Sequence, residues 1–314
     1  FPDSVVSIGE SAFIDNFTLT SVRFGSGLTS IGNNAFYYTG LRTLSIPNNV
    51  MNIGECAFQD CSSLTTVNLG SGVVNIGIEA FAGDSKLTSI TVASGNRVYS
   101  SLNGVLFNKD HTMLVQYPAG KTEKTYAIPT GVTAIGECAF ESCNITGVTI
   151  PGSITTIGDG AFSFTDLTGV SIPDSVTSLG DFVFYVCDKM TGVTLGSGIT
   201  SIAENTFLYC NAIRAFSVSG ANTAYSSSNG VLFNKDKTEL VLYPGGNSVT
   251  AYTVPDSVTT VGKYSFFECE NLTSVTIPDS VTVIDEGAFY DCAKLAELSL
   301  ADGLTSIVMG AFAY

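Results

Sequence analysis

Apolar residues recur along this chain at a fixed interval, in a unit that reads approximately P-x-S-V-T-x-I-G-x-x-A-F-x-x-C-x-x-L-x-x-V-x-I. We align the units on the central aliphatic residue, which we call the anchor. The anchors are Ile8, Ile31, Ile53, Ile76, Ile135, Ile157, Leu179, Ile202, Val261, Ile284 and Ile307. Successive anchors lie 22 or 23 residues apart, except for two gaps of 59 residues. Five residues after each anchor there is a Phe: Phe13, Phe36, Phe58, Phe81, Phe140, Phe162, Phe184, Phe207, Phe266, Phe289 and Phe312.

A unit of this length cannot bury its three or four apolar residues alone. Stacking each unit on the next brings equivalent residues together in continuous ladders. The pattern therefore predicts a β-rich solenoid, a right-handed stack of 22–23-residue coils. We expect one domain over residues 1–314.

Two strands are expected in each coil. The segment typified by LTSVTIP alternates apolar and polar residues and ends in Pro, which is typical of a short strand. SVTxI predicts a second one, and strands stacked along the axis should be parallel. The GxxAF segment is too short for more than one turn of helix.

Each 59-residue gap is one normal period plus an insert of 36 residues, at 93–128 and 219–254. Both inserts contain GVLFNKD, at 104–110 and 230–236. In each, VLFN and the following LV segment flank a turn-like cluster, NKDHT or NKDKT, which predicts a β-hairpin. The trailing TYAIP and AYTVP resemble the strand of an ordinary unit, so each insert should rejoin the sheet through one strand.

The unit IPDSVTxIGxxAFxxCxxLxxVxIP resembles the leucine-rich repeat of the BspA-like, or Treponema pallidum, type. The YSSxxGVLFNKDxTxLVxYP insert is similar to one that recurs in the same proteins, so the resemblance covers essentially the whole chain. Members are typically secreted or surface-displayed proteins of host-associated bacteria and of some protists, and several are regarded as adhesins. The resemblance implies an extracellular or cell-surface location and a binding role.

Charge excludes two classes of partner. The formal net charge is −15 and the pI is near 4.2, so neither nucleic acid nor an anionic membrane surface is an expected partner. The chain has no run of eighteen apolar residues, so membrane insertion is not expected, and the first residues lack the features of a signal peptide. Because the chain begins and ends inside a repeat unit, we expect it to be a piece of a longer protein.

Six of the eight cysteines occupy one repeat position, three residues after the Phe: Cys61, Cys143, Cys187, Cys210, Cys269 and Cys292. Asn16, Thr39, Asp84 and Thr165 hold the same position in other coils. A buried slot for a small side chain with a weak or polar donor explains this set, so we expect free cysteines. The even count leaves a Cys56–Cys61 disulfide, or one between neighbouring coils, as the alternative.

No residue pattern indicates catalysis, a cofactor or a metal. The one histidine, His111, lies in the expected hairpin turn of the first insert, where the second insert has Lys237. The carboxylates are scattered, and no Cys/His grouping, phosphate loop or GxSxG motif is present. We therefore expect a protein that is not an enzyme.

The middle residue of each VxI strand should point away from the core, which gives a mostly uncharged row that we call the hydroxyl stripe. Its members are Arg23, Ser45, Asn68, Thr91, Thr149, Ser171, Thr194, Ser217, Thr276 and Ser299. A solvated strand face explains the row; a flat binding platform is the functional interpretation, with Thr91, Thr149, Ser171, Thr194 and Ser217 as candidate contacts.

The inserts differ from the repeats in charge. They hold six of the thirteen basic residues and four acidic ones, so they are +2 together and the remaining chain is −17. Insertions in solenoids often carry the binding face. The candidate contacts there are Tyr99, Lys109, Tyr117, Lys121, Tyr225, Lys235 and Tyr243, although the tyrosines could instead cover a core widened by the insert.

The expected function is binding or adhesion outside the cell, with a protein or glycan partner such as host extracellular matrix. The alternative is a passive spacer that holds another domain away from the cell surface.

Overall fold

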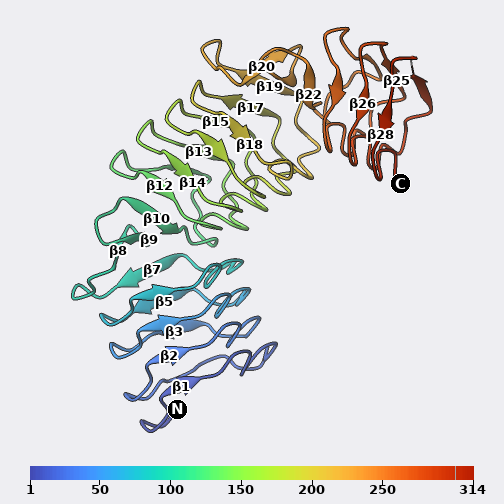
Figure 1. Ribbon diagram of the computed structural model, residues 1–314. Helices are drawn as coiled ribbons and strands as arrows, with labels where there is room; N and C mark the ends of the chain where they lie inside the picture. The colour runs from blue at the N-terminus through green and yellow to red at the C-terminus, as the bar shows by residue number, and fades with distance from the viewer. Residues whose placement is uncertain (301) are drawn as a thin grey trace. The chain divides into compact units, whose positions relative to one another are not determined.

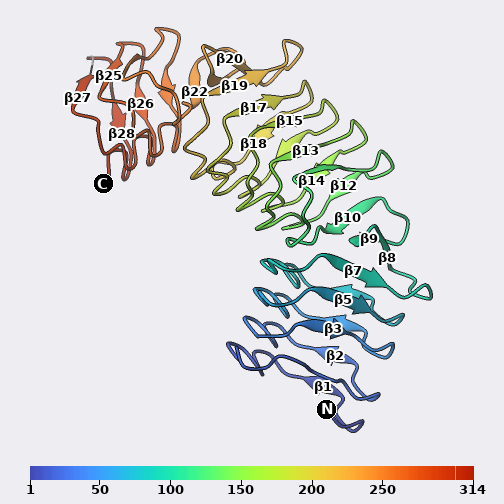
Figure 2. The same ribbon diagram turned by 180° about the vertical axis from the view of Figure 1, so that it is seen from behind.

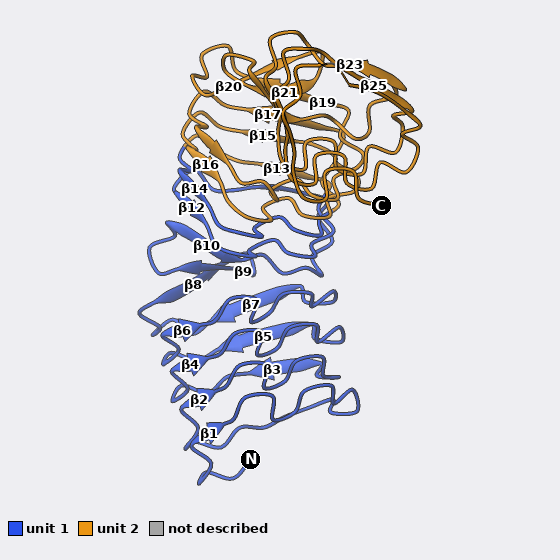
Figure 3. Ribbon diagram, turned by 45° about the vertical axis from the view of Figure 1, so that its right-hand side comes forward, with its two compact units in different colours: residues 1–145, 153–165 blue, residues 146–152, 166–314 orange. Residues whose placement is uncertain are grey.

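The structure, a computed structural model, describes residues 1–300 and 302–314 and contains strands and turns but no helix in these residues. It is a parallel β-solenoid of about 13 turns, which confirms the predicted fold class. The chain forms two compact units, residues 1–145 with 153–165 and residues 146–152 with 166–314 (Figure 3). Within each unit, successive coils stack as nearly parallel turns (Figures 1 and 2).

Every anchor lies in a strand of two residues, which confirms the second strand expected in each coil. Anchor pairs with anchor in parallel register, for example Ile31 with Ile53 and Ile53 with Ile76. These strands are β1 (Ser7–Ile8), β2 (Ser30–Ile31), β4 (Asn52–Ile53), β6 (Asn75–Ile76), β12 (Ala134–Ile135), β14 (Thr156–Ile157), β16 (Ser178–Leu179), β18 (Ser201–Ile202), β24 (Thr260–Val261), β26 (Val283–Ile284) and β28 (Ser306–Ile307).

The VxI segments form longer parallel strands with the expected alternation of buried and exposed residues, such as β5 with its buried Val67 and Leu69. They are β3 (Thr43–Ser45), β5 (Thr66–Leu69), β7 (Ser89–Val92), β11 (Thr125–Ala127), β13 (Gly147–Thr149), β15 (Val170–Ile172), β17 (Gly192–Leu195), β19 (Ala215–Val218), β23 (Ala251–Thr253), β25 (Ser274–Ile277) and β27 (Glu297–Leu300). In the second insert, β23 pairs with β25, so this insert rejoins the sheet as predicted.

Each insert folds as three antiparallel strands. These are β8 (Tyr99–Leu102), β9 (Val105–Asn108) and β10 (Met113–Gln116) in the first, and β20 (Tyr225–Ser228), β21 (Val231–Asn234) and β22 (Glu239–Leu242) in the second. The β9–β10 and β21–β22 hairpins confirm the prediction.

The β8–β9 and β20–β21 hairpins were not predicted. Both residues of the Asn103–Gly104 turn have positive φ, 51° and 79°, which is the type I′ geometry that Asn-Gly favours.

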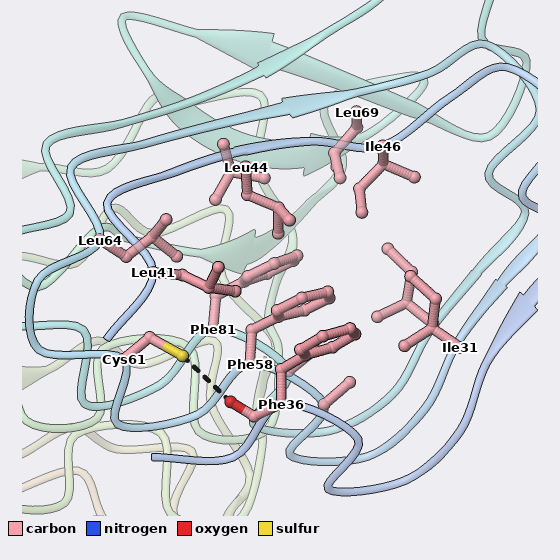
Figure 4. Packing of buried hydrophobic residues seen from close by; sticks show 14 of the residues in the cluster. Ile31, Phe36, Leu41, Leu44, Ile46, Phe58, Cys61, Leu64, Leu69 and Phe81 are labelled. Atoms are coloured by element: carbon pink, nitrogen blue, oxygen red, sulfur yellow. Dashed lines mark hydrogen bonds between the residues drawn. The ribbon is translucent and has the colours of Figure 1, made fainter. Parts of the chain in front are cut away.

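The Phe residues form a stacked ladder in the core. In unit 1 the ring centroids of Phe36 and Phe58 are 5.2 Å apart and those of Phe58 and Phe81 are 5.8 Å apart, with nearly parallel planes. Figure 4 shows these three rings one above the other, with Ile31 to one side and Leu44 and Ile46 above them. In unit 2, Phe266 stacks on Phe289 at 4.6 Å. The ladder confirms that the repeat Phe is a core residue in every coil except the first and last, where Phe13 is partly buried and Phe312 is 37% exposed.

The cysteine slot behaves as the repeat position predicted. All eight cysteines are free, and the six in the slot are buried. Cys61 Sγ donates to the carbonyl oxygen of Phe36 in the preceding coil at 3.2 Å (Figure 4), and Cys292 Sγ does the same to Phe266 at 3.0 Å. Thr39 and Thr165 fill the slot elsewhere and are also buried. A small hydrogen-bonding side chain is what this position requires.

The turn between the two strands of a coil uses the left-handed backbone region twice, three and seven residues after the anchor. Non-glycine residues at these positions have φ between 49° and 61°, except for Tyr314 at 69° and Asn205, which does not adopt this region. Such a conformation costs roughly 1 kcal/mol or more per residue. Stacking of coils with identical turns supports it. We call the surface formed by the side chains three, six and seven residues after the anchor the turn face.

Candidate binding surfaces

The hydroxyl stripe lies on the strands as expected. Its middle-of-strand residues are all exposed, which confirms that they point away from the core. Five were candidate contacts: Thr91 on β7, Thr149 on β13, Ser171 on β15, Thr194 on β17 and Ser217 on β19. Thr91 Oγ1 donates to Asn68 Oδ1 in the preceding coil at 2.6 Å.

Two of the insert tyrosines lie in the core. Tyr117 is 1% exposed and stacks on Phe140 at 5.1 Å; Tyr243 is 5% exposed and stacks on Phe266 at 5.0 Å. Each replaces the repeat Phe in the extra coil that its insert contributes, because β10 and β22 pair with the next anchor strand through Leu114 and Leu240. Their rings are therefore not available to a partner, so the candidate contact role is wrong for these two, and the alternative that the tyrosines cover the core is confirmed.

The other two insert tyrosines hydrogen-bond to the last short strand before each insert. The Tyr99 hydroxyl accepts a hydrogen bond from the Ile76 backbone N–H at 3.2 Å, and the Tyr225 hydroxyl accepts one from Ile202 N–H at 3.1 Å. Both rings are partly buried. Each hydroxyl therefore takes the place of the hydrogen-bond acceptor that the next short strand would provide to β6 or β18, because the insert displaces that strand.

The insert lysines differ in exposure and in hydrogen bonding. Lys109 is exposed, whereas the side chain of Lys121 is 13% exposed and its Nζ donates to Asn103 O at 3.1 Å. Lys235 Nζ donates to the carbonyl oxygen of Asn222. His111 lies in the hairpin turn with φ 56°, as Lys237 does with φ 55°, which fits a turn residue.

A groove lies beside each insert where the short-strand ladder is interrupted. In unit 1 it has a volume of about 400 Å³ and is lined mainly by apolar residues, with Glu79 and Glu137. In unit 2 the equivalent groove has about 320 Å³ and carries Glu204, Glu239 and Lys263. The two grooves share a position and differ in charge pattern.

The turn face of unit 2 carries a run of aromatic side chains that the repeat pattern did not suggest. We call Phe182, Tyr185, Tyr209, Tyr264 and Phe267 the aromatic column. Successive centroids lie 5.3, 5.4, 5.1 and 6.1 Å apart in the order Phe182, Tyr185, Tyr209, Phe267, Tyr264, all in edge-to-face contact. Phe182 is 43% exposed and Tyr209 is 38% exposed.

A hollow of about 530 Å³ opens within the column. Phe182 and Tyr264 line it together with Asp181, Glu204 and Asn205. Asn205 Oδ1 is buried and has no hydrogen-bond partner. Lys263 lies 3.3 Å from Glu204 and 3.7 Å from Glu286, so its charge is already paired at the rim. The hollow thus combines apolar rings with acidic and amide groups.

The sequence did contain a signal for this surface. Tyr185 and Phe267 lie six residues after their anchors, Tyr209 lies seven after, and Phe182 and Tyr264 lie three after. At these three repeat positions, aromatic residues are concentrated in the later coils.

The part of the chain that the structure describes contains no helix of the length and hydropathy needed to cross a bilayer.

Comparison with known proteins agrees with the fold. A search of curated proteins finds no match. Among solved structures, a leucine-rich repeat protein from Eubacterium ventriosum is 26% identical with a TM-score of 0.65, over 99% of this chain and 74% of that one. A leucine rich cell surface protein from Faecalibacterium prausnitzii is 25% identical with a TM-score of 0.51, over 93% of this chain and 76% of that one. The pneumococcal vaccine antigen PcpA shares the fold at 18% identity and a TM-score of 0.57, over 98% of this chain and 77% of that one.

The profile of the BspA type leucine rich repeat region matches six copies, over residues 1–108, 120–230 and 243–314. The chain therefore belongs to the BspA-type leucine-rich repeat family.

Proposed function

We propose that this chain is a binding module displayed at the cell surface, that it is not an enzyme, and that the aromatic column of unit 2 is its main contact with a protein partner. The observation that carries the proposal is the column itself: five rings in mutual contact on a surface, two of them more than a third exposed. Contiguous exposed apolar surface marks interaction sites, and Tyr is enriched among the residues that dominate interface energies.

The rigidity of the column supports this role. The aromatic rings contact one another from coil to coil, so they lose little freedom on binding. Asp181 and Glu204 beside the rings favour a partner that presents basic and apolar side chains together. The net charge of −15 favours the same kind of partner.

Surface display rests on the family and on the neighbour described as a cell surface protein. We propose adhesion to host extracellular matrix protein as the biological use. The hydroxyl stripe and Lys109 form a second candidate contact, which also suits a glycan.

A binding screen against host matrix proteins and glycans tests the proposal. We expect a protein hit, weakened about tenfold or more by Phe182→Ala with Tyr209→Ala. Tyr38→Ala is the matched control, because Tyr38 occupies the position of Tyr209 in a coil of unit 1 and is also exposed.

Two other results would redirect the assignment. Binding that is lost on charge reversal of Lys109, Lys121 and Lys235, and unchanged in the aromatic variant, would move the contact to the inserts. A chain that binds nothing on a broad array would favour the spacer.

A further inference from the structure

Two thiols and two carboxylates from three coils gather beside the first insert. The coils of Ile76 and Ile135 flank this insert, and Cys138 Sγ lies 3.3 Å from Glu79 Oε1. Cys138 Sγ and one carboxylate oxygen from each of Glu79 and Glu141 all lie within 4.8 Å of one another. Cys56 Sγ, from the coil before, lies 3.6 Å from Glu79 Oε2. We call Cys56, Glu79, Cys138 and Glu141 the acid–thiol cluster.

This cluster has no positive charge to balance it. Among residues 1–300 and 302–314, neither Glu79 nor Glu141 forms an ion pair. Glu141 Oε2 is buried and has no hydrogen-bond partner. Burial, followed by the Glu79 charge, raises the pKa of Glu141 to about 7 and that of the Cys56 thiol to about 12. Four groups that bind cations in their ionised form thus lie together without a cation.

The surroundings hold the cluster in place. Cys138 Sγ packs closely against Gly160 in the next coil, where an added Cβ would lie only 2.8 Å from the sulfur. Gln59 Nε2 donates to Glu79 Oε2 at 2.8 Å and orients that carboxylate from outside the cluster. Glu79 also lines the 400 Å³ groove beside the insert, which provides a path from solvent.

We propose that the acid–thiol cluster is a zinc site. The Cys138 thiolate and the Glu79 and Glu141 carboxylates offer three ligand atoms within 4.8 Å of one another for a tetrahedral Zn²⁺ site with water as the fourth ligand. Thiolate ligation favours zinc over calcium and magnesium, which take oxygen ligands. The Cys138 thiol gives its proton to solvent as its S–Zn bond forms, so binding through Cys138 releases one proton. Glu141 loses any proton it still carries. No electron is transferred.

The ligands come from the coil before the insert and from the coil after it, so a bound ion would tie these two coils together. A ligand that binds only the folded state stabilises it. Zinc should therefore raise the midpoint of thermal unfolding.

The test uses the whole chain, reduced and freed of metal with a chelator, and titrated with Co²⁺ and then with Zn²⁺. We expect one Co²⁺ per chain, with the near-ultraviolet charge-transfer absorption of thiolate ligation, and displacement by Zn²⁺. Cys138→Ser should abolish that absorption, and Glu79→Gln should weaken Zn²⁺ binding about tenfold or more. Cys61→Thr is the matched control and should keep full binding, because Cys61 lies in the buried slot that Thr39 fills in the preceding coil.

The unfolding midpoint gives an independent readout. Zn²⁺ should raise it by several degrees in the parent and in Cys61→Thr, and by clearly less in Glu79→Gln at the same concentration. Glu79 is partly exposed, so this variant should fold even if Cys138→Ser does not. Absence of thiolate absorption and of any zinc-dependent shift in the parent, or equal binding by parent and Glu79→Gln, would overturn the proposal.

Discussion

The two inserts create the same junction in two places, with different chemistry on the turn face. At each junction the coil before the insert and the coil after it meet. Tyr117 on Phe140 and Tyr243 on Phe266 have almost the same stacking, at 5.1 and 5.0 Å. On the turn face, the equivalent pairs are Glu79 and Asn205, Cys138 and Tyr264, Glu141 and Phe267.

The difference shows which positions the fold constrains. Core positions repeat because each ring must match the ring in the next coil. Turn-face positions need only a left-handed backbone three and seven residues after the anchor, which Cys138, Tyr264 and Gly160 all adopt. The residue types at these positions can therefore vary without loss of the fold. The acid–thiol cluster in unit 1 and the aromatic column in unit 2 are two such variations.

Removing a ladder ring should have the largest effect and should be the same at both junctions. Phe140→Ala and Phe266→Ala each open a cavity between stacked rings, and each should cost about 3–5 kcal/mol of unfolding free energy. Denaturant unfolding measures this. An unchanged transition for either variant would show that its ring is not packed inside.

In the coil before the first insert the buried slot holds Asp84, where the coil before the second insert has Cys210. Asp84 is fully buried, and neither carboxylate oxygen has a hydrogen-bond partner. Burial raises the pKa of the Asp84 carboxyl well above its usual range, with Asp60 adding to the shift. The folded state keeps a proton that the unfolded state loses above about pH 4, so the stability contribution falls as pH rises.

Asp84→Cys should therefore stabilise the chain by about 1–3 kcal/mol at pH 8, and by less at pH 4. Chemical unfolding at both pH values measures the difference. Equal stability changes at the two pH values would contradict a protonated, unpaired Asp84. Cys210→Asp should impose the opposite pH dependence on unit 2.

The tyrosine caps should have a smaller effect that is again shared. Tyr99→Phe and Tyr225→Phe each remove the hydroxyl that accepts the edge N–H of β6 or β18. Each should cost about 0.5–1.5 kcal/mol, measured by thermal or denaturant unfolding. A loss at one junction only would show that the two caps are not equivalent.

The spacing of anchors predicted the fold almost completely. Ile53 pairs with Ile76, and Phe36 stacks on Phe58, because a strict period leaves each coil one register in which its apolar residues meet like residues. The hairpins after VLFN followed from turn chemistry. Asn103–Gly104 is an equally strong turn signal, and it marks the β8–β9 hairpin that was not predicted.

The surfaces on the turn face could not be predicted in the same way. Glu79 and Cys138 are 59 residues apart in the sequence. The first insert adds a coil on the strand side, but the turns of the coils before and after it are in direct contact, which brings these two residues together. The role of Tyr117 stayed open between surface contact and core, because the extra coil reaches its ring position three residues after Leu114, whereas an ordinary coil takes five.

A double-mutant cycle on Tyr209 and Phe267 tests most directly that each insert brings its flanking coils into contact. Their centroids lie 5.1 Å apart although 58 residues separate them in the chain. The single and double alanine variants should show a coupling of about 0.5–1.5 kcal/mol in unfolding free energy. Additive effects, within about 0.3 kcal/mol, would mean that the rings do not touch and would contradict the junction.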